Sequence, residues 1–367
     1  MTNLGLTKYF PLTSLPLVIS ACAALFACKP GGERPDAVVS SVSFDASSDL
    51  RALLVSESKN CVYVADYYQK IIHCVDLTTH SNNTSAAFST TGKPVAMAMT
   101  NDNATLVVAT EDASTGSAIE IFTFGKTSPS PCTLPGPPNS VAVTDKNYIY
   151  VGVGGTQSSI YSCGTAAASI RNATPVTQLN GYNRIAGLSN DGTLMFTVSP
   201  DMSTVGFWNI HTAPTNVINA NNMFGALSNY GWIEFQPNDH EAFVFTDGTA
   251  TSQNTFPTYT LNTDNTLTGP HTKFAMNFLP NALAFSPDGK TALITHGIKG
   301  SVFLNADHEL SVPDLHIFDA STGAALGTIP LSDYVHQRGI AVGDDGTIYL
   351  LLGEQSASSI AVIPAPK

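Results

Sequence analysis

The chain has 367 residues, of which 43% are hydrophobic and 12% charged, so it carries enough apolar side chains for a large core. The formal net charge of −12 argues against a nucleic-acid partner, because binding DNA or RNA requires a basic surface that displaces counterions. Length alone does not separate one domain from two, since closed all-β folds use this much chain as a single domain.

The chain begins with a segment that is predicted to be a targeting signal. Lys8 precedes an apolar, Ala- and Leu-rich run over residues 10–27. The run ends in LFAC at 25–28, which resembles the bacterial lipobox, in which a small residue precedes the cysteine that becomes lipidated. Cys22 offers a second lipobox, but cleavage there would leave apolar residues in the mature protein. We therefore favour lipidation of Cys28.

This interpretation divides the chain into a signal peptide at 1–27, a tether at 28–36 and a folded domain at 37–367. It predicts an exported lipoprotein, attached to the membrane by its lipid in the periplasm, at the outer membrane or on the cell surface. The alternatives are a plain cleaved signal peptide and an uncleaved anchor helix.

Four further cysteines indicate disulfides, because an even set in an exported chain usually pairs. Cys61 opens one predicted strand and Cys74 closes the next, on either side of a turn at 67–70, so they are placed to face each other across a hairpin. Cys132 and Cys163 then follow as a pair by elimination. No spacing typical of a zinc site occurs, and no metal or cofactor is expected.

One unit of three apolar strands occurs seven times in the folded domain. The first strands are predicted at 49–56, 93–100, 138–144, 183–189, 230–236, 280–286 and 337–343. The second strands are predicted at 62–66, 105–110, 148–153, 194–199, 242–247, 292–296 and 347–352. The third strands are predicted at 71–76, 118–124, 159–163, 205–210, 258–261, 315–319 and 359–363. Turns rich in Asn, Asp and Gly join the first strand to the second.

The repeat distance of 44 to 57 residues is typical of a β-propeller, in which each unit forms one four-stranded blade. Fourth strands are poorly marked, and the last unit has no residues left to supply one. A strand-like run at 37–44 precedes the first unit. The sequence therefore predicts an all-β, seven-bladed β-propeller closed by an N-terminal strand that joins the last blade.

Two stretches carry a family resemblance. VYVADYYQKIIHCVD at 62–76 resembles an NHL-type repeat, and PNALAFSPDGKTALIT at 280–295 with LHIFDASTG at 315–323 resembles the YVTN/lactonase group of seven-bladed propellers. The resemblance covers about residues 37–363 and implies the fold rather than an activity. The broad group includes sugar-lactone hydrolases, lyases and many bacterial surface or periplasmic proteins, so fold does not choose among functions.

The starts of the first strands are expected to converge on the central channel, where propellers usually bind ligands. In the chosen alignment this ring consists of Arg51, Val95, Asn139, Arg184, Gly231, Asn281 and Arg338. Three of the chain's five Arg lie in it, and guanidinium groups with carboxamides suit a carboxylate or phosphate. The alternative is that each Arg forms an ion pair with a nearby carboxylate and so ties blades together. The candidate partners are Asp49, Asp66, Glu111, Asp247 and Glu354.

Two other groups of residues are candidates for function. His296 and His336 lie near the longest insertion, at 297–314, and are weak candidates for a general base, because their spacing matches no known ligand or catalytic motif. Tyr67, Tyr68, Tyr230 and Trp232 are candidates for stacking on a sugar at the rim, or else for packing between blades.

These features favour a cell-envelope lipoprotein whose propeller is a platform for a small anionic ligand or an envelope protein. The residues expected to bind the ligand are Arg51, Asn139, Arg184, Asn281, Arg338 and Trp232. The alternative is an enzyme of lactonase or lyase type that acts on an anionic small molecule. No nucleotide-binding or serine-hydrolase motif supports other chemistry.

Overall fold

The computed structural model divides the chain into Met1–Glu33 and Arg34–Lys367, and it describes only residues of the second unit. The described residues run from 39 to 366, apart from 113, 115, 127, 168–171, 202–203, 212–217, 222–229, 238–240, 247–256, 263–266, 275–279, 297–312 and 354–356. The predicted signal peptide, Cys28 and the tether therefore lie outside the described residues. No helix in the described part is long and apolar enough to cross a membrane.

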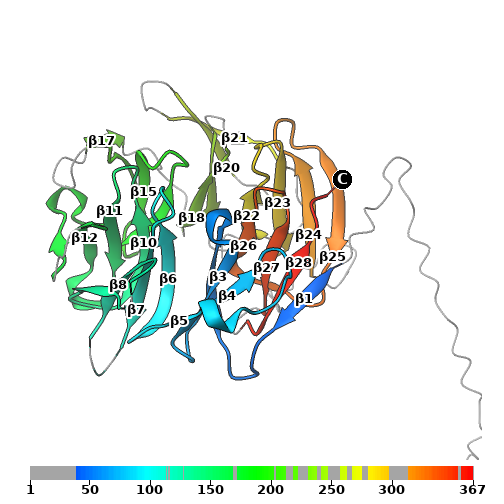
Figure 1. Cartoon of the computed structure of the whole chain (residues 1–367). Coiled ribbons are helices and arrows are strands. Elements are labelled where there is room, and N and C mark those ends of the chain that lie inside the picture. Colours follow the sequence, from blue (N-terminus) through cyan, green and yellow to red (C-terminus); the bar gives the residue numbers. More distant parts are fainter. Residues whose placement is uncertain are drawn as a thin grey trace, which may run out of the picture. The chain divides into compact units, whose positions relative to one another are not determined.

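Seven antiparallel sheets of four strands each make up the described domain, one sheet for each predicted blade (Figure 1). Blades one to three are β2–β5 (Leu50–Ser56, Cys61–Asp66, Ile71–Asp76, Phe88–Ser89), β6–β9 (Lys93–Met99, Thr105–Glu111, Ala118–Thr123, Ser130–Thr133) and β10–β13 (Pro138–Val143, Tyr148–Val153, Ser159–Thr165, Thr174–Pro175). Blades four to six are β14–β17 (Arg184–Leu188, Leu194–Val198, Val205–Asn209, Ile218–Asn221), β18–β21 (Tyr230–Phe235, Glu241–Thr246, Pro257–Leu261, Leu267–Thr272) and β22–β25 (Pro280–Phe285, Thr291–His296, Asp314–Asp319, Ala325–Pro330).

The seventh blade is built from both ends of the domain. Its strands are β26 (Val335–Val342), β27 (Ile348–Leu352), β28 (Ser359–Ile363) and β1 (Ser40–Ser43), in that order across the sheet. β1 pairs antiparallel with β28, so the two strands lie side by side in Figure 1. The prediction that an N-terminal strand joins the last blade is confirmed, although β1 is shorter than the strand-like run at 37–44.

The core lies between neighbouring blades. Second strands such as β3 and β15 are buried along their whole length, which explains their continuous apolar sequences. Phe196 and Phe207 of blade four, for example, pack in one cluster with Ile233 and Phe235 of blade five. The first strand of blade one is less buried than these second strands, since the five middle residues of β2 are all half-buried.

A register shift, in most blades a β-bulge, interrupts the pairing of the first and second strands near the start of every blade. The residue skipped by the ladder is Arg51 in blade one, Val95 in blade two, Asn139 in blade three and Asn281 in blade six. Bulges redirect side chains and are frequent beside functional sites. Gly231 and Arg338 lie in longer skipped stretches, at 231–232 and 336–339, so six of the seven predicted ring positions are unpaired in the ladder.

The turns between strands one and two are held by short polar contacts. In the turn at 286–291, the Ser286 hydroxyl donates to Asp288 Oδ1 at 2.7 Å, and the Lys290 N–H donates to the same oxygen at 3.1 Å. These hydrogen bonds lower the pKa of Asp288 to about 2. Gly289 adopts φ +69°, and a Cβ there would lie 2.3 Å from the Pro237 carbonyl oxygen of blade five. The turn thus needs glycine both for its backbone angle and for the contact between blades.

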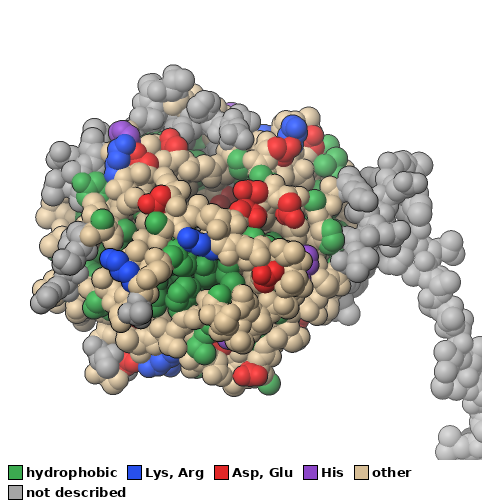
Figure 2. Space-filling model, viewed as in Figure 1, with side chains coloured by type: hydrophobic (Ala, Val, Ile, Leu, Met, Phe, Trp, Pro, Cys, Tyr) green, Lys and Arg blue, Asp and Glu red, His purple; other side chains and the backbone are tan. Residues whose placement is uncertain are grey.

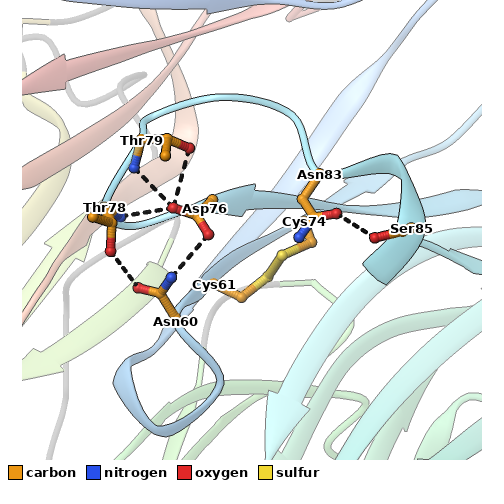
Figure 3. Close-up of a disulfide and its surroundings, with 8 residues drawn as sticks. All are labelled: Asn60, Cys61, Cys74, Asp76, Thr78, Thr79, Asn83 and Ser85. Carbon is orange, nitrogen blue, oxygen red and sulfur yellow. Dashed lines mark hydrogen bonds between the residues drawn. A yellow bond between two sulfur atoms is a disulfide. The ribbon is translucent and has the colours of Figure 1, made fainter.

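Both predicted disulfides are confirmed, between Cys61 and Cys74 and between Cys132 and Cys163. The first joins β3 to β4, but the cysteines are diagonal rather than directly opposite, since Cys61 pairs with Asp76 in the ladder. Figure 3 shows this disulfide beside the Asp76 carboxylate, which accepts hydrogen bonds from Asn60, Thr78 and Thr79. The second disulfide joins β9 of blade two to β12 of blade three.

Candidate functional site

A pocket of 590 Å³ lies between blades one and two and is here named the Tyr67 pocket. Its lining includes Tyr67 and Lys70 from the turn after β3, Lys93 from the start of β6, and Glu111 and Asp112 from the end of β7. These segments are the turn between strands two and three and the start of a first strand. They belong to the face on which the sequence predicts a ligand site, and the volume is typical of small-molecule sites.

Arg51 lies directly beside the Tyr67 pocket but is paired. Its Nε and Nη2 donate to Asp49 Oδ2 at 3.0 and 2.8 Å, and its guanidinium lies 3.5 Å from the centre of the Tyr67 ring. Asp49 is 2% exposed, so this carboxylate would carry an uncompensated charge without Arg51. At Arg51 the structure thus contains the ion pair of the alternative interpretation, and it adds an aromatic contact that orients Tyr67.

Lys93 and Glu111 are opposite each other in the ladder between β6 and β7, yet they do not form an ion pair in the described structure. Glu111 instead accepts a short hydrogen bond from the Tyr67 hydroxyl. This bond, together with burial, raises the pKa of Tyr67 to about 12, so the tyrosine remains a donor at neutral pH. The Lys93 ammonium lies 4.8 and 5.3 Å from the ring centres of Tyr67 and Tyr68. It is therefore available to a ligand anion.

Buried polar contacts hold the start of β6 in place. Glu120 of β8 is 1% exposed and accepts hydrogen bonds from the Thr91 N–H at 2.9 Å, the Thr91 hydroxyl at 2.8 Å and the Gly92 N–H at 3.3 Å. Lys93 follows these residues directly. Lys70 supports the same segment, because its Nζ donates to the Thr91 carbonyl oxygen at 3.1 Å and to Asp112 Oδ2 at 2.8 Å. Glu120 and Lys70 thus position Lys93.

The structure places the other predicted ligand residues in different blades. Asn139 is half-buried on β10, where its Oδ1 accepts a hydrogen bond from the Ser140 hydroxyl at 2.8 Å. Arg184 begins β14, and the skipped residue of that blade is Ala186, two positions later. Asn281, Arg338 and Trp232 lie on β22, β26 and β18, but their side chains are outside the described residues. A single anion site made by all of them stays a prediction.

The candidate histidines lie on blades six and seven. His296 ends β23, with its side chain outside the described residues, and His336 is half-buried on β26. As described, the lining of the Tyr67 pocket contains no histidine. Among the described residues, no group of three or more His, Cys, Asp or Glu is placed to hold a metal ion.

Sequence reasoning missed Lys93, Lys70 and Glu120. Lys93 lies two residues before the ring position in blade two, and its only signal in the sequence is a cation at the start of a first strand. Figure 2 shows that Lys and Arg side chains are scattered over the viewed face among acidic ones, without a continuous basic surface there. The site therefore depends on individual charged side chains that are held in position, and not on an extended charged surface.

No protein-family model and no curated protein matches the chain. Solved structures do match it over most of its length. The Cps50 (Swd1) beta-propeller domain of Myceliophteria thermophila is 9% identical, with a TM-score of 0.61 over 88% of this chain and 98% of that one. The chain is a β-propeller.

Two other solved structures match with similar scores. Hydrazine synthase from Kuenenia stuttgartiensis is 14% identical, with a TM-score of 0.62 over 88% of this chain and 97% of that one. A functionally unknown protein from Desulfotomaculum acetoxidans DSM 771 is also 14% identical, with a TM-score of 0.59 over 87% and 90% of the two chains. At these identities the similarity establishes the propeller fold only, so the function has to be argued from the residues of the site.

Proposed function

We propose that the protein is an exported lipoprotein whose β-propeller binds a small anionic ligand in the Tyr67 pocket. The propeller fold suits a binding or interaction platform, and the two disulfides indicate an oxidising, exported environment. Lipidation at Cys28 would hold the domain at the membrane. An envelope protein partner is the broader form of the same proposal, because propellers offer wide rigid faces.

The proposal rests mainly on the Lys93 ammonium, which contacts two tyrosine rings and no carboxylate among the described residues. A ligand carboxylate would supply the missing anion. Glu111 and Asp112 are acceptors in the same pocket, and Ser114 and Ser117 add hydroxyl groups. Acceptors beside a cation suit a ligand that carries hydroxyls as well as a carboxylate, and tyrosine rings suit the apolar face of a sugar. A sugar acid meets all these conditions.

Replacing Lys93 by glutamine is expected to weaken glucuronate binding about tenfold or more, because a hydrogen bond to a charged group contributes about 1.5–3 kcal/mol. The measurement is isothermal titration of the purified protein, supported by the rise in melting temperature with glucuronate, galacturonate or inorganic phosphate. Lys290→Gln is the matched control, since Lys290 is 82% exposed and lies outside the pocket.

The result that contradicts the proposal is equal binding of glucuronate to Lys93→Gln and to the wild type. Failure of all three anions to bind the wild type would exclude the anionic ligand and leave the protein-interaction platform. Chemistry of lactonase or lyase type remains the alternative function. It requires a base near the ligand, and the two carboxylates of the Tyr67 pocket already accept hydrogen bonds, Glu111 from Tyr67 and Asp112 from Lys70.

The anchor is expected to be Cys28. Radioactive palmitate should label the wild-type protein in cells and the Cys22→Ser variant, whereas Cys28→Ser should stay unlabelled. Labelling that survives in Cys28→Ser would place the lipid elsewhere or support a plain signal peptide.

A further inference from the structure

A second pocket, of 600 Å³, lies between the closing strand β1 and blade one, and we propose that it binds a neutral saccharide. It is named the closing-strand pocket, and the side chains that matter are Phe44, His73, Asn82, Thr84 and Phe88. Phe44 directly follows β1, whereas the others come from β4, β5 and the loop between them. The proposal does not depend on the anionic site, because the two pockets have no lining residue in common among those that the structure describes.

His73 is held in a fixed orientation at the wall of this pocket. Its Nε2 lies 3.3 Å from Asp66 Oδ2, and Asp66 is fully buried. The other oxygen of Asp66 accepts hydrogen bonds from the N–H groups of Asp49 and Gln69, so the carboxylate cannot turn away. The His73 ring also packs against Phe44, with 4.8 Å between ring centres. Nδ1 is therefore a preorganised polar group, and it has no recorded partner in the described part of the chain.

Asn82 supplies an acceptor without a partner. Its Oδ1 is buried and receives no hydrogen bond in the described structure. The backbone around it is fixed, because Asn82 forms a bridge with Val75 and the Asn83 N–H donates to the Cys74 carbonyl oxygen at 2.7 Å. A buried acceptor that lacks a donor costs free energy, and a ligand hydroxyl or amide N–H would remove that cost.

The charges at the two pockets select different ligands. The closing-strand pocket has Asp45 in its lining and, among the described residues, neither Lys nor Arg. Its one basic ring, His73, already faces Asp66. An anion would meet a carboxylate with no free cation, so a neutral ligand is favoured. Phe44 and Phe88 provide apolar walls, while Asn82, Thr84 and His73 provide hydrogen-bonding groups. Aromatic walls with several neutral hydrogen-bonding groups suit the two faces and the hydroxyls of a sugar ring.

The test is isothermal titration of the purified protein with maltose, cellobiose and N,N′-diacetylchitobiose. At least one of these disaccharides is expected to bind, and Asn82→Ala is expected to weaken that binding about tenfold or more, as expected for one buried hydrogen bond and its desolvation. The Asn82 side chain makes no hydrogen bond in the described structure, so urea denaturation should show no loss of stability for this variant. Asn83→Ala is the matched control, because the Asn83 side chain accepts from Ser85 at 2.7 Å outside the pocket (Figure 3).

A second measurement does not depend on any variant. Hydrogen exchange of backbone amides in residues 80–89 should slow when the bound disaccharide is added to the wild-type protein. Absence of binding by all three disaccharides, equal binding by Asn82→Ala, or slowed exchange only around Tyr67 would each overturn the proposal. Glucuronate binding should be the same in Asn82→Ala and the wild type, which separates this site from the anionic one.

Discussion

Replacing Cys132 and Cys163 together by alanine is expected to lower the free energy of unfolding by about 4 kcal/mol, the value for a crosslink that closes a loop of this length. The two cysteines are 31 residues apart, and both are fully buried. Their disulfide joins β9 to β12 and so links the outer strand of blade two to blade three. Its loss would remove a covalent link between blades as well as a restraint on the unfolded chain.

The control for this variant is Cys61→Ala with Cys74→Ala. That disulfide spans 13 residues within one blade, so its removal is expected to cost about 3 kcal/mol. Both variants are compared with the oxidised wild type by urea denaturation monitored by circular dichroism. A smaller loss for the disulfide between blades than for the one within a blade would show that blades two and three are held together mainly by packing.

Replacing Glu120 by alanine is expected to lower the free energy of unfolding by at least about 3 kcal/mol and to abolish glucuronate binding. The substitution leaves the buried N–H group of Gly92 and the N–H group of Thr91 without their acceptor. The segment that they hold leads directly into Lys93, so the ammonium loses its position above the tyrosine rings. Glu120→Gln should lie between the wild type and Glu120→Ala, since one amide oxygen remains to accept.

The control is Glu57→Ala. Glu57 is exposed and accepts one hydrogen bond, from the Asp344 N–H at 2.8 Å, so its loss should cost no more than about 1 kcal/mol and leave glucuronate binding intact. Stability is measured by urea denaturation and binding by titration. A fully stable Glu120→Ala that still binds glucuronate would show that Lys93 does not need this support.

The fold was largely predictable because each blade repeats the same local signals. Continuous apolar second strands follow tight polar turns, and both properties are encoded within a few residues. The outer strands were not predictable. β5 (Phe88–Ser89) and β13 (Thr174–Pro175) have two residues each, which is too short for any alternation of apolar and polar side chains. Their place is set by the edge of the finished sheet.

The candidate site was predictable only in part. Aligning the repeats placed Arg51 and Tyr67 near one face, and they do lie in contact. Lys93 was missed because it lies two residues before the ring position, and a cation at the start of a first strand is its only signal in the sequence. In the ladder it lies opposite Glu111, where a lysine ordinarily forms an ion pair. In the structure the Tyr67 hydroxyl donates a hydrogen bond to the Glu111 carboxylate instead. Nothing in the sequence indicates that Glu111 has this partner rather than Lys93. In blade four, the bulge at Ala186 rather than at Arg184 is likewise a property of strand pairing.

The closing strand also determines when the fold can be finished. Ser40 and Val362, which pair in blade seven, are 322 residues apart. At ~5–20 residues per second, a ribosome takes on the order of tens of seconds to synthesise the stretch between them. During that time β1 has no partner, and blade seven cannot close until the last strand has been made. Completion of the propeller therefore follows synthesis of its last strand, β28.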